Sequence, residues 1–371
     1  MKSPMDVHRH AGSVLWVAAC CEAPPRSGGA LRSHRLIEAL RAAGIGVEVV
    51  HAGWSGVAGR ALALARGWPL SAAHAWTPRH ARRVRAAQRA GCVVVADDLA
   101  SSVVPILTAR TIVALQNVES ARAPMPTRGV RRRFDAWLER RGVCAIERRL
   151  LRSPAELVVV SQRDAQLLGR GLVVRNGADV PVHPPPPGAG SPVFVGALDY
   201  RPNEDAVRWW ASDVWPRLRS RAPLVVVGRR AGEVLGDLRG HPAIALVGEV
   251  ADVAPHLAAA AFAVVPLRAG EGTRLKVLEA MAHARPVVGT RKALEGLDLG
   301  EADGVVEADG AEALAAAVDA LVVDRARVRA LAQRARDRAK DFAWDVVSLP
   351  FVELVRRMLA QESGWPSPNR R

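Results

Sequence analysis

The stretch FAVVPLRAGEGTRLKVLEAMAHARPVVGT, residues 262–290, decides the fold class. It begins with a run that is apolar nearly throughout, as in a strand buried on both faces. In the helix expected from about Thr273 to Ala284, Leu275 and Leu278 follow the spacing that produces one apolar face. A second apolar run, RPVVGT, follows at 285–290. A strand, a helix and a strand in this order predict part of a parallel sheet.

The same alternation extends along the whole chain of 371 residues. Short apolar, β-branched runs alternate with helix-like stretches, which predicts strands covered on both faces by helices. We therefore expect an α/β protein with two tandem Rossmann-like, doubly wound parallel-sheet domains. The runs lie at 13–21, 47–53, 92–98, 111–117, 157–162 and 172–177 in the first half, and at 192–198, 224–230, 244–250, 262–268, 285–290 and 304–308 in the second.

A proline and glycine run, PVHPPPPGAGSP at 181–192, separates the two sets. Such a run can neither pair in a sheet nor continue a helix, so it predicts an interdomain linker. Ligands of doubly wound sheets bind beyond the carboxyl ends of the strands, so we expect the active site in a cleft between the domains. The expected divisions are an N-terminal domain over 1–182, a linker over 183–191, a C-terminal domain over 192–343, a helix over 344–361 that crosses the interface, and a tail over 362–371.

The composition of the chain limits the classes of protein to which it can belong. Hydrophobic residues make up 49% of the chain and charged residues 24%, as in a soluble globular protein. The net charge of +15 favours anionic partners such as phosphorylated ligands, acidic lipid headgroups or nucleic acid, although biased codon usage explains it equally well. Four cysteines lack the spacing of a zinc site or a disulfide framework, which indicates a reducing compartment. The apolar run near the start is shorter than a spanning helix and is interpreted as a first strand.

Two carboxylates in the opening stretch point to chemistry. Glu271 precedes the helix, where free backbone N–H groups can hold an anion such as phosphate. Glu279 flanks the apolar face and therefore needs a hydrogen-bond partner. Arg274 and Lys276 lie between them. The structural alternatives are that Glu271 complements the helix dipole, at ~0.3–1 kcal/mol, and that Glu279 pairs with Lys276, at ~0.2–0.5 kcal/mol.

The string GEGTRLKVLEAMAHARPVVGT resembles the donor-site motif of retaining glycosyltransferases with the GT-B fold, in the family 4 group (glycosyl transferases group 1). In that motif seven residues separate two glutamates. A lone pair of acids at this spacing is weak evidence, whereas the full string is strong evidence. The resemblance covers most of the chain and includes SGG at 27–29, SQRDAQLL at 161–168, VVRNGAD at 173–179, VGALDYRPNEDAVRWW at 195–210, and VGEVADVAPHLAAAAFAVVPLRAGEGTRLKVLEAMA at 247–282.

The resemblance implies roles in donor binding. Glu271 would contact the hydroxyls of the donor sugar, and Glu279 would accept the ribose hydroxyls of the nucleotide. Arg201 is a candidate for the diphosphate, but the chain lacks the lysine that similar proteins carry shortly after it. The other implied donor residues are Gly272 and Thr273 beside Glu271, Arg274 and Lys276 as substitutes for the missing lysine, and Gly228, Arg229, Gly248 and Glu249 in loops around the base.

On the acceptor side, the resemblance points to LQNVES at 115–120. Gln116 stands where similar proteins often have a histidine, and an amide cannot take up a proton at neutral pH. The leaving phosphate can itself accept the proton of the acceptor hydroxyl, so a strong base is not required. Asn117 and Glu119 are the expected catalytic groups on this side. Gly28 and Gly29 would let the backbone approach the phosphates or the acceptor, or would simply form a turn.

The expected function is a cytoplasmic transferase that moves a sugar, with retention of configuration, from a nucleotide sugar to a glycan or lipid-linked acceptor in cell-surface polysaccharide or glycolipid synthesis. We expect no cofactor and no essential metal, because basic side chains and helix starts can offset the diphosphate charge. One alternative is a nucleotide-sugar 2-epimerase of the same fold. The other is a non-catalytic basic protein that binds nucleic acid, for which the sequence contains no recognition motif; a specific nucleic-acid partner is not expected.

The segment 130–153 carries arginines beside Phe134 and Trp137. One interpretation is a peripheral contact with an anionic membrane on the inner face of the cell membrane. The other is a long amphipathic helix that packs on its own domain and exposes a basic face to solvent. The second interpretation is slightly favoured.

Overall fold

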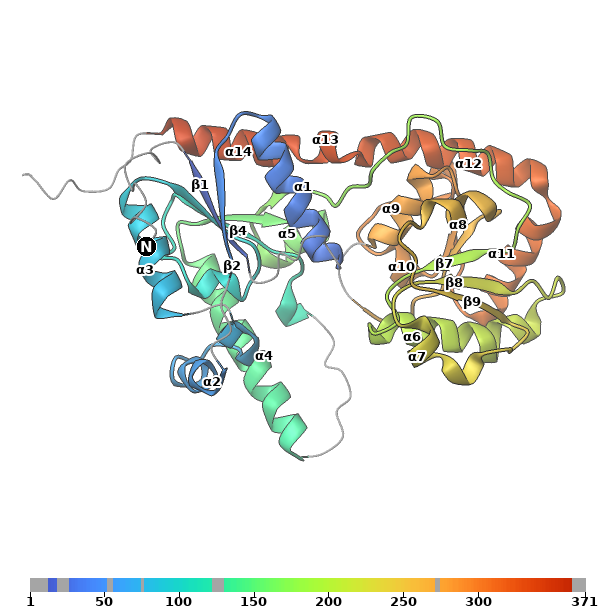
Figure 1. Ribbon diagram of the computed structural model, residues 1–371, viewed down its shortest axis with the longest axis horizontal. Helices are drawn as coiled ribbons and strands as arrows, with labels where there is room; N and C mark the ends of the chain where they lie inside the picture. Colours follow the sequence, from blue (N-terminus) through green and yellow to red (C-terminus); the bar gives the residue numbers. More distant parts are fainter. Residues whose placement is uncertain are drawn as a thin grey trace, which may run out of the picture. The chain divides into compact units, whose positions relative to one another are not determined.

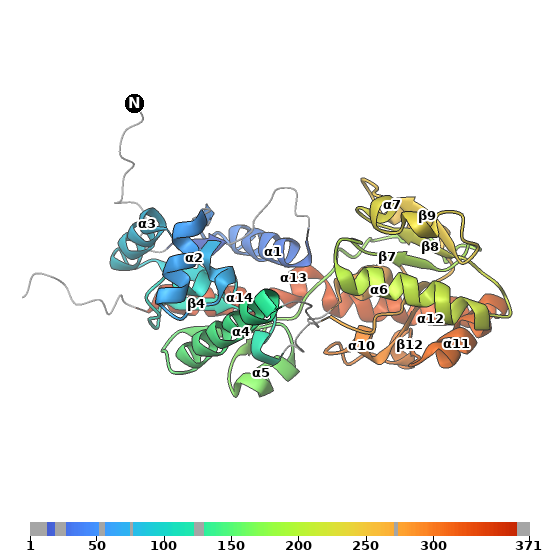
Figure 2. The same cartoon turned by 90° about the horizontal axis from the view of Figure 1, so that it is seen from below.

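The computed structural model describes residues 13–18, 27–51, 56–74, 77–121, 130–270 and 274–361 (Figure 1). The chain forms two compact units, one of residues 1–175 with 348–371 and the other of residues 176–347. Each unit contains a six-stranded sheet in which every pair of neighbouring strands is parallel. Helices cover both faces of each sheet (Figures 1 and 2). The predicted class of two doubly wound α/β domains is therefore confirmed.

The sheet of the first unit has the strand order β2-β1-β3-β4-β5-β6. Its strands are β1 (Val14–Ala18), β2 (Val47–His51), β3 (Val93–Ala96), β4 (Thr111–Ala114), β5 (Glu156–Val159) and β6 (Leu172–Val173). Its helices are α1 (Gly28–Ala42), α2 (Gly56–Ala65), α3 (Pro78–Arg89), α4 (Val130–Leu151), α5 (Gln162–Leu168) and α14 (Leu349–Ala360), with short 3-10 turns η2 (Leu70–His74), η3 (Ser101–Val103) and η4 (Glu119–Ala121).

The sheet of the second unit has the order β12-β11-β10-β7-β8-β9. Its strands are β7 (Val193–Val195), β8 (Leu224–Val227), β9 (Ile244–Gly248), β10 (Ala263–Val265), β11 (Val287–Gly289) and β12 (Val305–Glu307). Its helices are α6 (Arg201–Trp209), α7 (Ala231–Val234), α8 (Ala254–Ala259), α9 (Leu275–Ala282), α10 (Arg291–Leu294), α11 (Ala311–Val323), α12 (Arg325–Ala339) and α13 (Trp344–Val347), with the short helical turns η5 (Trp210–Val214), η6 (Trp215–Arg217), η7 (Gly236–Leu238), η8 (Glu301–Asp303) and η9 (Lys340–Phe342).

Side chains of the strands build a core on each face of each sheet. In β3, Val94 and Ala96 join one apolar cluster, and Val93 and Val95 join the cluster on the opposite face. This is the alternation that a pleated strand imposes. Because both faces are covered, all four side chains are fully buried, which explains why the strands are apolar throughout in the sequence.

The segment expected to be the interdomain linker, 183–191, instead belongs to the second unit, and the boundary between the units lies at 175/176 rather than 182/183. The Gly188 N–H donates to the carbonyl of Ala260 at 3.1 Å. Arg325 donates to the carbonyls of Gly188 and Ala189 at 3.1 and 2.9 Å. The glycines that follow the prolines keep their N–H donors, so this end of the segment can pair with the backbone of Ala259 and Ala260 and also offer carbonyls to Arg325.

The single helix expected over 344–361 is divided into α13 and α14. Pro350 lies in the first turn of α14, where its missing N–H costs nothing, but it cannot continue a preceding helix. Helix α14 belongs to the first unit. Phe351 packs edge-on against Trp16 of β1, with ring centroids 5.9 Å apart. The chain thus returns to its first unit after completing the second.

Within the part of the chain that the structure describes, no helix combines the length and the apolar character needed to cross a membrane.

Candidate donor site and acceptor-side groups

The second sheet reverses its strand order between β7 and β10. The chain adds β8 and β9 on one side of β7, and then adds β10, β11 and β12 on the other side. Doubly wound sheets bind ligands at such a reversal, outside the carboxyl ends of the strands. Gly196 follows β7 there, and the loop that leads into α9 follows β10.

Lys276 lies in the first turn of α9 and is fixed at this reversal. Its Nζ donates a hydrogen bond to Oδ1 of Asn203 at 2.6 Å and lies 4.2 Å from the centroid of the Phe194 ring. The Nδ2 of Asn203 donates in turn to the carbonyl of Ala197 at 2.7 Å. A Cβ at Gly196 would lie only 2.6 Å from the lysine Nζ, so the amino group and this backbone are closely packed. We call Lys276, Asn203 and Gly196 the lysine cluster.

The environment of Lys276 disfavours its charged form. The pKa of its ammonium group is lowered to about 7, mainly by burial and also by the positive charge of Arg274, whereas the charge of Glu279 acts in the opposite direction. Within the described residues, no carboxylate forms an ion pair with Lys276. An anionic ligand would supply the missing opposite charge and favour protonation.

Arg274 lies at the start of α9 and is only 7% exposed. A Cβ at Gly270 would lie 2.9 Å from the Tyr200 hydroxyl and 3.3 Å from Nη2 of Arg274, so both groups border this loop. The backbone of Arg274 is extended, and α9 therefore begins at Leu275 and ends at Ala282. The helix expected from Thr273 to Ala284 was predicted too long at both ends.

Glu271, Gly272 and Thr273, which the sequence places at the donor sugar, lie outside the described residues. Arg201 is the first residue of α6 and is exposed. Within the described part of the chain, its side chain forms no hydrogen bond or ion pair. Arg201 is therefore not joined to the lysine cluster by a hydrogen bond or an ion pair within the described residues.

Glu279 is a half-buried carboxylate among other acids. Burial raises its pKa, and the carboxylates of Asp179 and Asp252 raise it further, while Lys276 lowers it. No donor among residues 130–270 and 274–361 forms a hydrogen bond with its carboxylate. The alternative of a Glu279–Lys276 pair is not the one formed, because the lysine donates to Asn203 instead. Such a carboxylate is suited to accept the hydroxyls of a ligand.

The loops expected around a base meet at the carboxyl ends of β7, β8 and β9. Gly228 has a φ of +158°, and a Cβ there would lie 1.9 Å from the Gly196 carbonyl oxygen, so only glycine fits. Its N–H donates to the carbonyl of Gly248 at 2.7 Å. Arg229 forms an ion pair with Asp199 at 2.9 Å. Glu249 is exposed and, within the described residues, forms no side-chain contact.

The first unit brings its expected polar groups together. The Nδ2 of Asn117 donates to Oε1 of Glu119 at 3.3 Å. Gly28 and Gly29 begin α1, whose N-terminus is capped by Ser27. A Cβ at Gly29 would lie 3.7 Å from the Gln116 side chain, an ordinary contact, so the structure shows no steric need for glycine there.

Sequence reasoning missed two carboxylates that follow β3 in the first unit. Asp97 accepts a hydrogen bond from the Ser33 hydroxyl at 2.6 Å, and burial raises its pKa to about 7. Burial also raises the pKa of Asp98, which accepts a hydrogen bond from the Ser101 N–H at 2.6 Å and is influenced by the charge of Glu119. The signal was present as two consecutive acids directly after a buried strand.

Comparisons with known proteins agree with this geometry. Residues 191–324 match the family described as glycosyl transferases group 1. This range includes Glu279, the lysine cluster and the two loops expected around the base, which follow β8 and β9. No curated protein sequence matches the chain significantly.

Several solved structures share the fold over nearly their whole length. Sucrose-phosphate synthase from Thermosynechococcus elongatus has a TM-score of 0.67 and 17% identity, covering 94% of this chain and 98% of its own. Anabaena HepE, solved in complex with UDP-glucose, has a TM-score of 0.64 and 14% identity, covering 93% and 99%. WaaG, a glycosyltransferase involved in lipopolysaccharide biosynthesis, has a TM-score of 0.62 and 14% identity, covering 92% and 99%.

Residues 191–324 of the second unit therefore match the glycosyl transferases group 1 family, and the chain has the two-domain GT-B fold of these solved structures.

Proposed function

We propose that the protein is a family 4 enzyme that transfers a sugar, with retention of configuration, from a nucleotide sugar to a hydroxyl of a glycan or lipid-linked acceptor. In this proposal the second unit binds the donor and the first unit supplies acceptor-side groups. The UDP-glucose bound to HepE supports a nucleotide sugar as donor. The role of WaaG in lipopolysaccharide biosynthesis supports cell-surface polysaccharide or glycolipid synthesis. A lipid-linked acceptor would bring the enzyme to the cytoplasmic face of a membrane as a peripheral protein.

The carboxylate of Glu279 is the observation that carries the proposal. It is half-buried, has acidic neighbours at Asp179 and Asp252, and receives no hydrogen bond from a described residue. The two hydroxyls of a ribose would donate to its two oxygens and offset the cost of burial. Binding of a ribose would therefore give the burial of this carboxylate a physical reason.

The lysine cluster and Arg274 would receive the diphosphate. The diphosphate would restore the charged form of Lys276, because an adjacent anion raises the pKa of an ammonium group. Two basic side chains would then stabilise the charge that develops on the leaving group, as an oxyanion site does. The proposal therefore needs no essential metal and no cofactor.

In the reaction, the bond between the sugar's anomeric carbon and the phosphate oxygen breaks, and its electron pair goes to the leaving nucleoside diphosphate. The acceptor oxygen forms its bond to the same face of that carbon, and its proton passes to the leaving phosphate. Glu271 would hold the donor sugar, and Asn117 and Glu119 would hold the acceptor hydroxyl. Gln116 takes no part in proton transfer, since an amide has no basic site at neutral pH.

The test begins with binding. Thermal shifts with UDP, GDP, dTDP, ADP and CMP sugars would be compared for the wild type, Glu279→Ala and the control Glu312→Ala, an exposed position on α11. Stabilisation by one nucleotide class that is lost only in Glu279→Ala is the expected result. The anomeric configuration of the transferred sugar, measured by NMR, then tests retention. Unchanged binding and transfer in Glu279→Ala, or an inverted product, would refute the proposal.

A further inference from the structure

Helix α6 carries one member of the lysine cluster, Asn203, and is bound by side chains from both sides of the sheet reversal. It follows β7 directly, before the chain adds β8 and β9 on one side and β10 on the other. At 100° per residue, three sides of the helix are formed by Asn203, by Glu204 with Arg208, and by Asp205 with Trp209. Asn203 is only 4% exposed and accepts the hydrogen bond of Lys276.

The side formed by Glu204 and Arg208 is bound to the connection between β8 and β9. These two residues are one turn apart and form an ion pair at 2.9 Å. Arg208 also donates to Oδ2 and Oδ1 of Asp237 at 2.6 and 3.1 Å, and to the carbonyl of Val234 at 2.8 Å. Val234 ends α7 and Asp237 lies in η7, so α6 is attached to the β8 side of the reversal.

The side formed by Asp205 and Trp209 is bound to the end of β10 by Arg268. The Nε of Arg268 donates to Oδ2 of Asp205 at 3.0 Å, and its Nη2 donates to Oδ1 at 2.6 Å. The same guanidinium lies over the Trp209 ring, 5.1 Å from its centroid. Because Arg268 follows β10 closely, one side chain attaches two positions of α6 to the carboxyl end of this strand. We call Arg268, Asp205 and Trp209 the arginine clamp.

The arginine clamp fixes direction as well as distance. Two parallel N–H···O bonds orient the guanidinium plane relative to the carboxylate, and stacking on an aromatic ring restricts it further. The side chains of Arg268 and Asp205 are 48% and 42% exposed. Ion pairs with such exposure contribute little to stability, so the main consequence of the clamp is the orientation of α6.

The charge of Arg268 alone does not explain this arrangement. Asp205 accepts two hydrogen bonds from the guanidinium and offsets its charge. The pair therefore offers no net charge to an anionic ligand. What it does offer is a fixed relation between β10 and the helix that presents Asn203 to Lys276.

We propose that the arginine clamp positions α6 so that Asn203 holds the amino group of Lys276 at the diphosphate of the donor. Arg268 and Asp205 are then positioning residues, which act through Asn203 without touching the donor. The inference rests on the proposed function, because it takes Lys276 to meet the diphosphate. It adds to that function two side chains that lie outside the lysine cluster and 63 residues apart along the chain.

The experiment measures the Kd of the donor by calorimetry, and the probe is the nucleotide sugar that stabilises the wild type in the thermal-shift screen. Asp205→Asn removes a negative charge, so electrostatics alone would strengthen the binding of an anion. Loss of the clamp should instead weaken it about 3- to 30-fold. Arg268→Lys keeps the charge but lacks the paired bonds and the stack, so it should show a similar loss. Asp205→Glu keeps the carboxylate and should bind within about twofold of the wild type.

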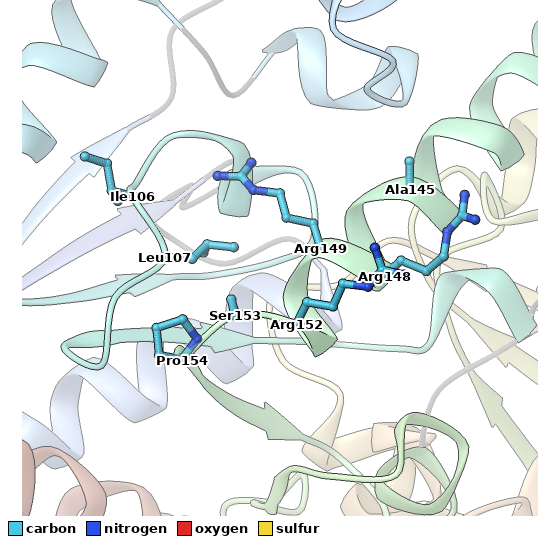
Figure 3. Close-up of a pocket in the computed structure, with 8 residues that line it drawn as sticks. All are labelled: Ile106, Leu107, Ala145, Arg148, Arg149, Arg152, Ser153 and Pro154. Atoms are coloured by element: carbon cyan, nitrogen blue, oxygen red, sulfur yellow. The ribbon is translucent and has the colours of Figure 1, made fainter.

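Two control variants should bind the donor as the wild type does. Arg338 forms ion pairs with Asp303 at 3.2 Å and Asp341 at 2.6 Å and lies over the Phe342 ring at 5.2 Å. Asp303 precedes β12, so Arg338→Gln removes a similar set of contacts from the opposite edge of the sheet. Arg152 is exposed and lines a pocket at the end of α4 in the first unit (Figure 3). Arg152→Gln therefore controls for the loss of one positive charge.

A double-mutant cycle separates positioning from a general loss of structure. In the Lys276→Met background, Arg268→Lys should have no further effect on the Kd, because the clamp acts through the lysine. A second measurement needs no nucleotide. The chain has only four lysines, so lysine-selective ¹³C labelling gives four sets of side-chain NMR signals, and those of Lys276 are identified by their loss in Lys276→Met. These signals should shift in Asp205→Asn and stay in place in Arg338→Gln.

Four outcomes, obtained with a wild type that binds the donor, would overturn this inference and leave the proposed function standing. They are tighter or unchanged binding in Asp205→Asn, full binding in Arg268→Lys, an equal loss from Arg268→Lys with and without Lys276, and Lys276 signals that do not respond to Asp205→Asn. A wild type that binds none of the nucleotide sugars would refute the proposed function and this inference together.

Discussion

Replacing Lys276 by methionine should make the protein more stable near neutral pH and weaken its binding of the donor. Methionine has a similar length and no charge, so it can occupy the space beside Phe194 and Gly196. It removes a burial cost that the wild type carries, but it leaves Oδ1 of Asn203 without a donor, at about 1–3 kcal/mol. The loss of the donor to Asn203 does not depend on pH, whereas the burial cost of the lysine does.

The magnitude follows from the titration of Lys276. Its pKa is 10.5 in an ordinary environment and about 7 in the folded protein. Because the folded pKa is the lower one, the unfolded chain binds more protons between these values, and the wild type gains stability as the pH rises through this window. One pKa unit corresponds to about 1.4 kcal/mol, so the gain from pH 7 to pH 9 is about 2 kcal/mol. For a unit of this size that is a rise in Tm of about 4–8 °C relative to the variant.

Thermal melts of the wild type and Lys276→Met would be recorded at pH 7, 8 and 9. The control is Lys340→Met, because the Lys340 side chain is 60% exposed and pairs with Asp337 at 2.8 Å. The Tm of the control should change with pH as the Tm of the wild type does. The Tm difference between the wild type and Lys276→Met should change between pH 7 and pH 9 by the amount given above. Parallel curves for all three proteins would show that Lys276 titrates normally, and the reasoning about the lysine cluster would be wrong.

Three further predictions concern other positions. Gly228→Ala should cost 3 kcal/mol or more in urea unfolding, because of its positive φ and the clash with a carbonyl, whereas Gly236→Ala, with no atom within 4 Å, should be neutral; equal effects would contradict the packing. Glu279→Gln should weaken donor binding by about 10- to 100-fold in calorimetry, since a charged acceptor is replaced by a neutral one, and an unchanged Kd would remove the ribose assignment. Burial raises the pKa of Asp97 from 3.8 to about 7, so the folded state binds more protons and the wild type loses about 2–3 kcal/mol from pH 5 to pH 8; Asp97→Asn should lack this loss, and equal slopes would contradict it.

The fold was largely predictable from local patterns. Each of the twelve apolar runs overlaps one strand of the two sheets, because strands buried on both faces are mainly apolar. The division of the chain was less predictable. The proline segment was expected to link the two domains, but it belongs to the second unit, where the distant Arg325 binds its carbonyls. Pro350 marked the break in the last helix and was overlooked.

The site residues that belong to one sequence motif were predictable. The site residues that only tertiary contacts bring together were not. The spacing of Glu279 within its string was sufficient to single it out. Asn203, by contrast, lies 73 residues from Lys276 along the chain, and the sequence did not single it out. No local pattern indicates that these two side chains meet. The burial that shifts the pKa of Asp97 is likewise a property of the packed sheet rather than of its neighbours in sequence.

The last helix of the chain belongs to the first unit, so this unit cannot be completed on the ribosome before the second unit has been synthesised. This reverses the usual order, in which the N-terminal domain folds first. Phe351 of α14 covers Trp16 of β1, yet about 170 residues are synthesised between the main part of the first unit and this helix. At about 5–20 residues per second, the core around Trp16 stays uncovered for roughly 10–35 s. The second unit is continuous in sequence and can fold within that interval. The first unit is therefore the part of the nascent chain most exposed to aggregation. A chaperone would bind this unit first, and a chain truncated near residue 347 would leave its core uncovered.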